Sequence, residues 1–303
     1  MTTWVAWLNF TSLLTPPSNP DSQMHRVLVT GASGLIGGLV VKHLGHKYNM
    51  SALNRRPVEG VPCTRADIAD LEAILPAFEG VDMVVHMANY LDDMNDWEQH
   101  LAAGIIGTRN VFEAARLGGV KRVVYGSTGD TQTGYEYDED LPYGALAAGK
   151  YDQAPKEWPM INYRDPVRPK NLYGTCKVFG EALGSQYADL YELSVLCIRL
   201  GAVLPEDRPL TRRQLVSYLS HADCISVVDK CLELPLTHRY DIFRATSHSR
   251  YRWMDFEHTR EVLGWEPQST ADDFEVDDAG GWHQVLPDYV ERRKLKQRRD
   301  ADS

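Results

Sequence analysis

The sequence has few of the features that mark secreted, membrane-spanning or metal-binding proteins. It contains only five cysteines, and none of them forms a Cys-x-x-Cys pair or joins His and Asp in a spacing typical of a metal site. No apolar run approaches the ~18 residues needed to cross a bilayer. We therefore expect reduced thiols in a cytoplasmic protein, with no metal and no membrane partner.

Basic residues are also fewer than acidic ones. The 303 residues carry 32 Lys and Arg against 42 Asp and Glu, which gives a formal net charge of −10. Because an acidic surface repels polyanions, this balance argues against nucleic acid as the main partner. The 43% content of hydrophobic residues is enough for a packed core, so the composition predicts a globular protein.

The two ends of the chain differ from its middle. Residues 1–24 contain an apolar stretch that no Lys or Arg precedes, unlike a secretory signal, and prolines follow it. We interpret this segment as a disordered leader or an over-long start. Residues 276–303 are expected to form a tail.

Between these ends, short Val-rich segments alternate with amphipathic ones. We predict strands at 26–30, 50–54, 81–88, 120–128 and 193–200, and helices at 35–46, 70–79, 105–117 and 172–190. Strands that are apolar on both faces are typical of a parallel sheet covered by helices. The predicted fold class is therefore α/β, a Rossmann-type doubly wound parallel sheet over residues 25–200 with a small C-terminal substrate-binding subdomain over 201–275.

Two regions depart from this alternation. Residues 129–170 are rich in Pro, Gly, Tyr and Asp, and so long a loop inside a domain is usually functional. Its aromatic side chains could line a pocket or form a lid, or they could anchor the insertion on the surface or on a second subunit. In the subdomain we expect one loop and one helix over 202–235, a strand near 241–245 that returns to the sheet, and a helix at 255–263.

A glycine-rich turn joins the first predicted strand to the first predicted helix. The segment TGASGLIG (30–37) places its glycines so that the first permits a tight turn and the second lets the backbone approach a pyrophosphate. The third glycine allows the helix to pack closely on the strand, and the anion would sit at the helix N-terminus. The turn predicts a dinucleotide site with contacts from Gly31, Ser33, Gly34, Leu35, Ile36 and Gly37.

The residues after the second predicted strand bear on which dinucleotide is bound. An acidic residue there would bind the ribose 2′-hydroxyl of NAD, but this chain has Asn54, Arg55 and Arg56. Two arginines suit a 2′-phosphate, which favours NADP over NAD. Alternatively, the arginines are exposed loop charges and Asn54 serves the hydroxyls of NAD.

Asp67, which Ile68 follows, is a further candidate contact to the dinucleotide. It lies where such folds often touch the adenine edge. It could equally serve to cap the helix that begins near Asp70.

Tyr173 and Lys177 form a second pattern, inside the predicted helix at 172–190. Their i,i+4 spacing places the phenol and the ammonium group on one helix face. A phenol with a pKa near ~10 is a poor base at neutral pH, and a nearby cation favours its phenolate form. The pair predicts proton transfer at Tyr173, and the alternative is a surface tyrosine that packs on a lysine stem.

Together these motifs resemble those of the extended short-chain dehydrogenases/reductases, in the NAD-dependent epimerase/dehydratase superfamily, over about residues 25–275. The matching segments are TGASGLIG (30–37), VVHMAN (84–89), GIIGTRNVFEAA (104–115), VVYGST (123–128), YGTCK (173–177) and IRLG (198–201). The resemblance implies that Tyr173 is the catalytic base and acid, and that Lys177 holds the nicotinamide ribose and lowers the tyrosine pKa. It also implies that Thr128, with Ser127 beside it, hydrogen-bonds the reacting oxygen. Further expected cofactor contacts are Met87, Ala88 and Asn89.

The second half of the chain is similar to uronate dehydrogenases and to short-chain-type glucose-6-phosphate dehydrogenases. The similar segments are 179–201, 218–224 and 263–268. Those enzymes oxidise the anomeric carbon of a sugar to a lactone, which implies a sugar, sugar acid or sugar phosphate as the substrate. In that comparison Arg213 falls where an arginine binds a uronate carboxylate, and Asp130 lies among the substrate contacts. Arg213 could instead pair with surface acids.

Some residues depart from the family pattern. Uronate dehydrogenases have Ser-Asn-His where this chain has Thr128, Gly129 and Asp130. The asparagine common in the helix at 105–117 is replaced by Gly104, and the segment 136–170 is longer. These changes alter the contacts to substrate hydroxyls and leave the identity of the sugar open.

The predicted function is hydride transfer from a sugar hydroxyl to NAD(P). A nucleotide-sugar epimerase or dehydratase is the alternative, although dehydratases usually place Asp and Glu directly after the active-site Thr. A non-catalytic NAD(P)-binding regulator ranks third. By analogy with similar proteins, we expect a homodimer formed through the helices at 105–117 and 172–190.

Overall fold

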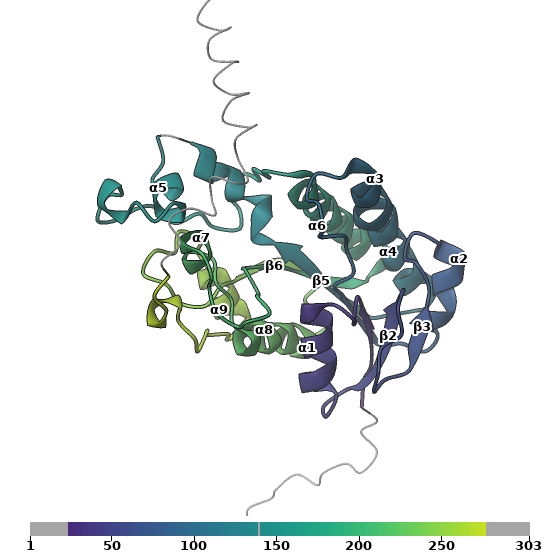
Figure 1. Cartoon of the computed structure of the whole chain (residues 1–303). Coiled ribbons are helices and arrows are strands. Elements are labelled where there is room, and N and C mark those ends of the chain that lie inside the picture. The colour runs from purple at the N-terminus through teal and green to yellow at the C-terminus, as the bar shows by residue number, and fades with distance from the viewer. Residues whose placement is uncertain (1–23, 139, 277–303) are drawn as a thin grey trace, which may run out of the picture.

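One parallel sheet runs through the part of the chain that the structure describes (Figure 1). This computed structural model describes residues 24–138 and 140–276, so nearly all of the predicted leader and of the predicted tail lie outside the described residues. The strands are β1 (Arg26–Thr30), β2 (Asn49–Asn54), β3 (Cys63–Arg65), β4 (Met83–His86), β5 (Arg122–Thr128), β6 (Ser194–Leu200) and β7 (Tyr240–Ala245). They pair in the order β3-β2-β1-β4-β5-β6-β7, and every pair is parallel. Because the order reverses between β1 and β4, the predicted doubly wound Rossmann class is confirmed.

Helices cover both faces of the sheet, as its alternating side chains require. Val27 and Val29 of β1 point into a core shared with α1 (Leu35–Leu44), α8 (His221–Glu233) and α9 (Glu257–Leu263). Leu28 lies between them and points to the opposite face, where α2 (Leu71–Ile74), α4 (Thr108–Leu117) and α6 (Leu172–Tyr191) complete a second core. Burial on both faces explains why the strands read as unbroken apolar runs.

Three elements before β5 differ from the predicted ones. The short strand β3 was not predicted, because three residues carry no readable periodicity. The predicted helix at 70–79 is α2 followed by the 3₁₀-helix η1 (Leu75–Phe78), which has a proline in its first turn. The predicted helix at 105–117 begins earlier, with α3 (Trp97–Gln99) and the π-helix η2 (His100–Gly107) leading into α4, because π turns break the 3.6-residue period.

The insertion at 129–170 contains short helices instead of a plain loop. They are η3 (Gly129–Thr131), η4 (Thr133–Tyr137), α5 (Tyr143–Ala147) and η5 (Tyr151–Gln153). Tyr143 stacks on Trp253 with ring centres 4.8 Å apart, and Tyr151 stacks on Tyr251 at 3.5 Å. These aromatic side chains therefore anchor the insertion on the C-terminal part of the chain.

The segment at 202–235 holds two helices where one was predicted, α7 (Arg212–Leu215) and α8. The extra helix starts with a capping box, in which the side chains of Thr211 and Gln214 each bond the backbone of the other. This fixes the first turn of α7, on which Arg213 lies. None of the described helices is long and apolar enough to cross a membrane.

Candidate active site

The glycine turn after β1 leaves the start of α1 open to an anion. Gly31 has a φ of 71°, and a Cβ at this position would lie 2.7 Å from the backbone nitrogen of Ala88. A Cβ on Gly37 would overlap the carbonyl oxygen of Gly31, so the turn admits no larger residue at either point. Gly34 is the N-cap of α1 and supplies no side-chain cap. The first N–H groups of α1 therefore stay available to a pyrophosphate.

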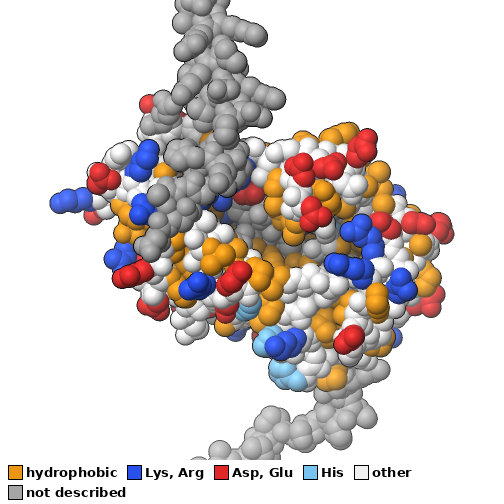
Figure 2. Space-filling view, viewed as in Figure 1, with side chains coloured by type: hydrophobic (Ala, Val, Ile, Leu, Met, Phe, Trp, Pro, Cys, Tyr) orange, Lys and Arg blue, Asp and Glu red, His pale blue; other side chains and the backbone are white. Residues whose placement is uncertain are grey.

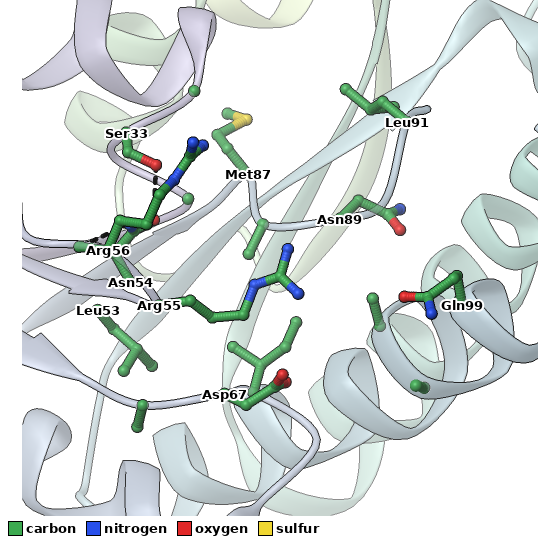
Figure 3. Close-up of a pocket in the computed structure, with 17 residues that line it drawn as sticks. Ser33, Leu53, Asn54, Arg55, Arg56, Asp67, Met87, Asn89, Leu91 and Gln99 are labelled. Atoms are coloured by element: carbon green, nitrogen blue, oxygen red, sulfur yellow. Dashed lines mark hydrogen bonds between the residues drawn. The ribbon is translucent and has the colours of Figure 1, made fainter. Parts of the chain in front are cut away.

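A cleft opens beside this turn, at the carboxyl ends of β1, β2 and β4 (Figure 3). It lies where the strand order reverses, which is where doubly wound sheets bind ligands. The predicted contacts that line it are Gly31, Ser33, Gly34, Asn54, Arg55, Arg56, Asp67, Ile68, Met87, Ala88 and Asn89. Of the other predicted contacts, Leu35, Ile36 and Gly37 belong to α1 and are not among the residues that line the cleft.

Some residues of the cleft were not predicted. They are Leu53, Ala66, Leu91, Gln99, Ala102 and Ala103. The last three reach the cleft because α3 and η2 extend the helix that ends in α4. The sequence offers no motif for the positions on α3 and η2, and they could have been found only by extending the predicted helix toward the N-terminus.

The Asn54–Arg56 segment is tied to the glycine turn. The Ser33 hydroxyl donates to Asn54 Oδ1 at 3.3 Å, and the Asn54 side-chain amide donates to the backbone oxygen of Arg56 at 2.7 Å. Figure 3 shows Arg55 extending into the cleft and Arg56 lying beside Ser33. Both arginine side chains lack an ion-pair partner among the described residues. Their charges are therefore free to meet an anionic ligand.

Two further residues fit a dinucleotide. Asp67 lines the cleft and accepts from the backbone nitrogen of Ala69 at 2.9 Å, whereas Asp70 caps α2. Asp70 is thus the residue that caps α2, and a contact between Asp67 and the dinucleotide stays a prediction. Asn89 also lines the cleft, and its buried Nδ2 has no hydrogen-bond partner among the described residues. An unpaired buried amide is costly, so this group fits a ligand that accepts a hydrogen bond.

The tyrosine and lysine of α6 lie at the end of β5. The side chain of Asn171 caps α6 by accepting from the backbone nitrogen of Gly174 at 2.7 Å. Lys177 is buried, and its Nζ donates to the backbone oxygen of Gly126 at 2.6 Å. That nitrogen also lies 5.7 Å from the centre of the Tyr173 ring. The i,i+4 spacing therefore brings a cation and a phenol together beside the last residues of β5.

Burial has the largest effect on the pKa values of Tyr173 and Lys177. Burial raises the pKa of Tyr173, the nearby charge of Asp130 raises it further, and the hydrogen bond with the Thr128 hydroxyl lowers it. Burial lowers the pKa of Lys177 to about 8. The phenol is therefore neutral at neutral pH, and an added positive charge nearby would favour the phenolate.

Ser127 and Thr128 make different contacts. The buried Ser127 hydroxyl donates to Glu181 Oε1 at 2.6 Å, and Glu181 forms a buried ion pair with Arg199, NH2 to Oε2 at 2.7 Å. Thr128 instead contacts the phenol of Tyr173. Thr128 is thus the hydroxyl beside the phenol of Tyr173, and Ser127 is held by the Glu181–Arg199 pair.

Two buried arginines connect the sheet to the insertion. Arg199 of β6 donates to the backbone oxygen of Tyr163 at 3.1 Å. Arg244 of β7 donates to the side-chain oxygen of Gln132, whose amide in turn donates to the backbone oxygen of Asn162 at 3.0 Å. The insertion is therefore fixed to the carboxyl ends of β6 and β7.

Asp130 and Arg213, the two predicted substrate contacts, lie near each other. Asp130 Oδ2 accepts from the side-chain amide of Asn171 at 3.2 Å, and its Oδ1 lies 3.5 Å from Lys170 Nζ and 4.0 Å from Arg213 NH2. Arg213 also pairs with Glu136, which is buried. The partner of Arg213 is thus Glu136, a buried carboxylate of the insertion, and not one of the surface acids that the sequence offered as the alternative.

The missing asparagine of the family pattern has a local explanation. A Cβ at Gly104 would lie 2.8 Å from the Cβ of Cys176, one residue before Lys177. The thiol of Cys176 donates to the backbone oxygen of His100 at 3.7 Å, and burial raises its pKa. The π-helix and α6 are therefore packed too closely for a side chain at 104. No group of three or more His, Cys, Asp or Glu among the described residues could hold a metal ion.

The sheet order, the open helix start and the adjoining tyrosine–lysine corner define a dinucleotide-binding Rossmann protein. The family model described as "NAD dependent epimerase/dehydratase family" matches residues 27–221, and the chain belongs to this family. An L-arabinose 1-dehydrogenase (NAD(P)(+)) of Haloferax volcanii is 30% identical, over 82% of this chain and 98% of that protein. An NAD-dependent glucose-6-phosphate dehydrogenase of the same organism is also 30% identical, over 82% and 95%. The crystal structure of a uronate dehydrogenase mutant from Agrobacterium tumefaciens, complexed with NAD, has a TM-score of 0.69 and 28% identity, over 83% of this chain and 88% of that one.

We expect the stability of a Lys177→Met variant, relative to the unchanged protein, to fall as the pH rises. Because the pKa of Lys177 is lowered to about 8, the folded protein loses this proton between pH 8 and 10.5 while the unfolded chain still holds it. The unchanged protein therefore gains up to ~3 kcal/mol over the variant across that window. Urea unfolding of both proteins at about pH 7.5 and about pH 9.5 measures the difference.

The exposed Lys42→Met change serves as the matched control, and its effect on stability should not follow the same window. A stability difference for Lys177→Met that stays constant from about pH 7.5 to about pH 9.5 would contradict the buried, charged state assigned to Lys177.

Proposed function

We propose that the protein is an NAD(P)-dependent dehydrogenase that oxidises a sugar, at the hydroxyl of its anomeric carbon, to a lactone. The observation that carries this proposal is the placement of Tyr173, Lys177 and Thr128 at the end of β5, next to the cleft that fits a dinucleotide. The names of the arabinose, glucose-6-phosphate and uronate dehydrogenases support it, since all three oxidise sugars or sugar derivatives.

The cofactor would be held by the turn at Gly31, the N-terminus of α1 and the side chains at the end of β2. The cradle at Gly31, which a Cβ would fill, and the unpaired amide of Asn89 fit such a ligand. When bound, an oxidised nicotinamide supplies the acceptor for a hydride and a positive charge beside the site. Lys177, held by the oxygen of Gly126, would bind the nicotinamide ribose.

The chain's own part in the reaction is the movement of one proton. Tyr173 takes the proton of the anomeric hydroxyl as the hydride leaves the same carbon, so a C=O bond replaces the C–H and O–H bonds. Thr128 orients the sugar oxygen and donates to the phenolate. Lys177 stabilises that phenolate, and burial keeps water away from it. Ser127, bound to Glu181, holds the end of β5 in position.

The alternative of a nucleotide-sugar epimerase or dehydratase has less support. The arabinose dehydrogenase is matched over nearly its full length. The sequence after Thr128, Gly129-Asp130, lacks the acid pair that dehydratases usually carry. A non-catalytic regulator would have no need of the Tyr173–Lys177 pair.

NADP is proposed as the preferred cofactor because Arg55 and Arg56 lie at the end of β2 beside the cleft and have no ion-pair partner within residues 24–138 and 140–276. Figure 2 shows Lys and Arg side chains gathered over the region of β2 and α4, on a chain whose net charge is −10. An arginine at this place can make charge-assisted hydrogen bonds to a 2′-phosphate, and the hydroxyl of NAD offers no such charge.

A cytoplasmic homodimer is proposed for the assembled protein. The described cysteines are all free thiols, as expected for a reducing compartment. The helices α4 and α6 pack side by side, and they carry exposed apolar side chains at Leu117 and Leu190. An exposed apolar patch of this kind suits a second copy of the chain.

We expect Tyr173→Phe to reduce the rate of sugar-dependent reduction of NADP by at least ~10²-fold, because the base that takes the hydroxyl proton is gone. Cofactor affinity, followed by the fluorescence of bound NADPH, should change by less than about threefold. The matched control is Tyr191→Phe, which removes an exposed hydroxyl from the same helix and should leave the rate unchanged. A Tyr173→Phe protein with full activity would contradict the assigned base.

Replacing both Arg55 and Arg56 with Ala should raise the KM for NADP at least ~10-fold, since two charge-assisted contacts to the 2′-phosphate are lost. The KM for NAD should change by less than about twofold. Arg65→Ala, at an exposed position on β3, is the control for loss of nearby positive charge. If both cofactors weaken equally in the double variant, the arginines do not recognise the 2′-phosphate.

A further inference from the structure

Arg213 is already bound to a carboxylate of its own chain. Its Nε and NH2 lie 3.0 Å from the two carboxylate oxygens of Glu136, in a bidentate pair. The side chain of Glu136 is 2% exposed, while that of Arg213 is 25% exposed, so one edge of the guanidinium remains accessible. Glu136 thus occupies the Nε–NH2 edge of Arg213 and already neutralises its charge.

Both partners of this pair are held rigidly. Glu136 belongs to η4 of the insertion, and Arg213 belongs to the first turn of α7, which its capping box fixes. The helix α5 packs against both η4 and α7 and so holds the two together. Separating them would leave Glu136 charged and buried with no partner, which is strongly unfavourable.

The pair of Arg213 and Glu136 lies near Tyr173, on the side where the proposed substrate would bind. Asp130 connects the two, because it is 4.0 Å from Arg213 and its charge acts on the phenol of Tyr173. Lys170, 3.5 Å from Asp130, is the second cation of the group. The two cations and two carboxylates therefore balance, and this group offers no net positive charge to a substrate.

We infer that Glu136 makes this site select neutral sugars over uronates and sugar phosphates. The inference rests on the proposed dehydrogenase function and names its substrate class. A uronate would bring a third carboxylate next to Asp130 and Glu136, and the single guanidinium between them is already bidentate. A neutral aldose meets no such repulsion, and its hydroxyls can bond to Asp130 and to the accessible edge of Arg213.

The first experiment uses the unchanged protein and sugars that, within each series, share every hydroxyl from C1 to C4 and differ at C6. Reduction of NADP and of NAD is followed with glucose, glucuronate, glucuronamide and glucose 6-phosphate, and with galactose and galacturonate. The aldoses should exceed the matching uronates at least ~10-fold in kcat/KM. Glucuronamide, which has nearly the shape of glucuronate without its charge, should behave like the aldose.

The second experiment changes the charge of Glu136 with little change in shape. Glu136→Gln should shift the uronate-to-aldose ratio of kcat/KM at least ~10-fold toward the uronate, because Arg213 regains a free positive charge. Glu157→Gln, at an exposed position of the same insertion, is the matched control and should leave the ratio unchanged. Circular dichroism and thermal melting establish that each variant is folded.

The outcomes separate the inference from the proposed function. If no sugar reduces either cofactor, the proposed function fails and the inference falls with it. If the unchanged protein oxidises uronates as well as the matching aldoses, the dehydrogenase function stands and the inference is overturned. A folded Glu136→Gln protein with an unchanged ratio would also overturn it. If that variant does not fold, the inference is tested by comparing kcat/KM for glucuronamide and glucuronate in the unchanged protein. Equal values for the two would overturn it.

Discussion

The arrangement of this protein depends on pairing charged side chains that are buried at the carboxyl ends of its central strands. Arg199 of β6 is bound to Glu181 of α6, and Lys177 of the same helix is bound to the end of β5. A buried charge without a partner is strongly unfavourable, so each of these pairs joins two elements in one position. Because these interactions lie around the end of β5, they fix the positions of Thr128 and Tyr173.

The need to pair buried charges also explains how the insertion at 129–170 is held in place. Arg199 and Arg244 bind its backbone and the side chain of Gln132, and its aromatic side chains stack on the C-terminal part of the chain. The insertion thereby carries Glu136 to Arg213. A segment that looks like a loop in the sequence thus carries the carboxylate that we infer to select the substrate.

The sequence predicted those features that depend on neighbouring residues. The Val-rich strands, the turn at 30–37 and the i,i+4 pair of Tyr173 and Lys177 are local patterns, and the Rossmann class follows from them. The bond between Glu136 and Arg213 joins residues 77 positions apart, and no local sequence pattern predicts it. The π-helix before α4 escaped prediction because its turns depart from the 3.6-residue period, and the cleft residues that it supplies were missed with it.

The central claim is that the anomeric hydrogen of a sugar leaves as a hydride. An aldose that carries deuterium at C1 tests it most directly, with the reduced cofactor isolated and examined by proton NMR or mass spectrometry. The account predicts one deuterium at C4 of the nicotinamide and a slower rate wherever hydride transfer limits turnover. Sugar oxidation that yields reduced cofactor without deuterium would contradict it.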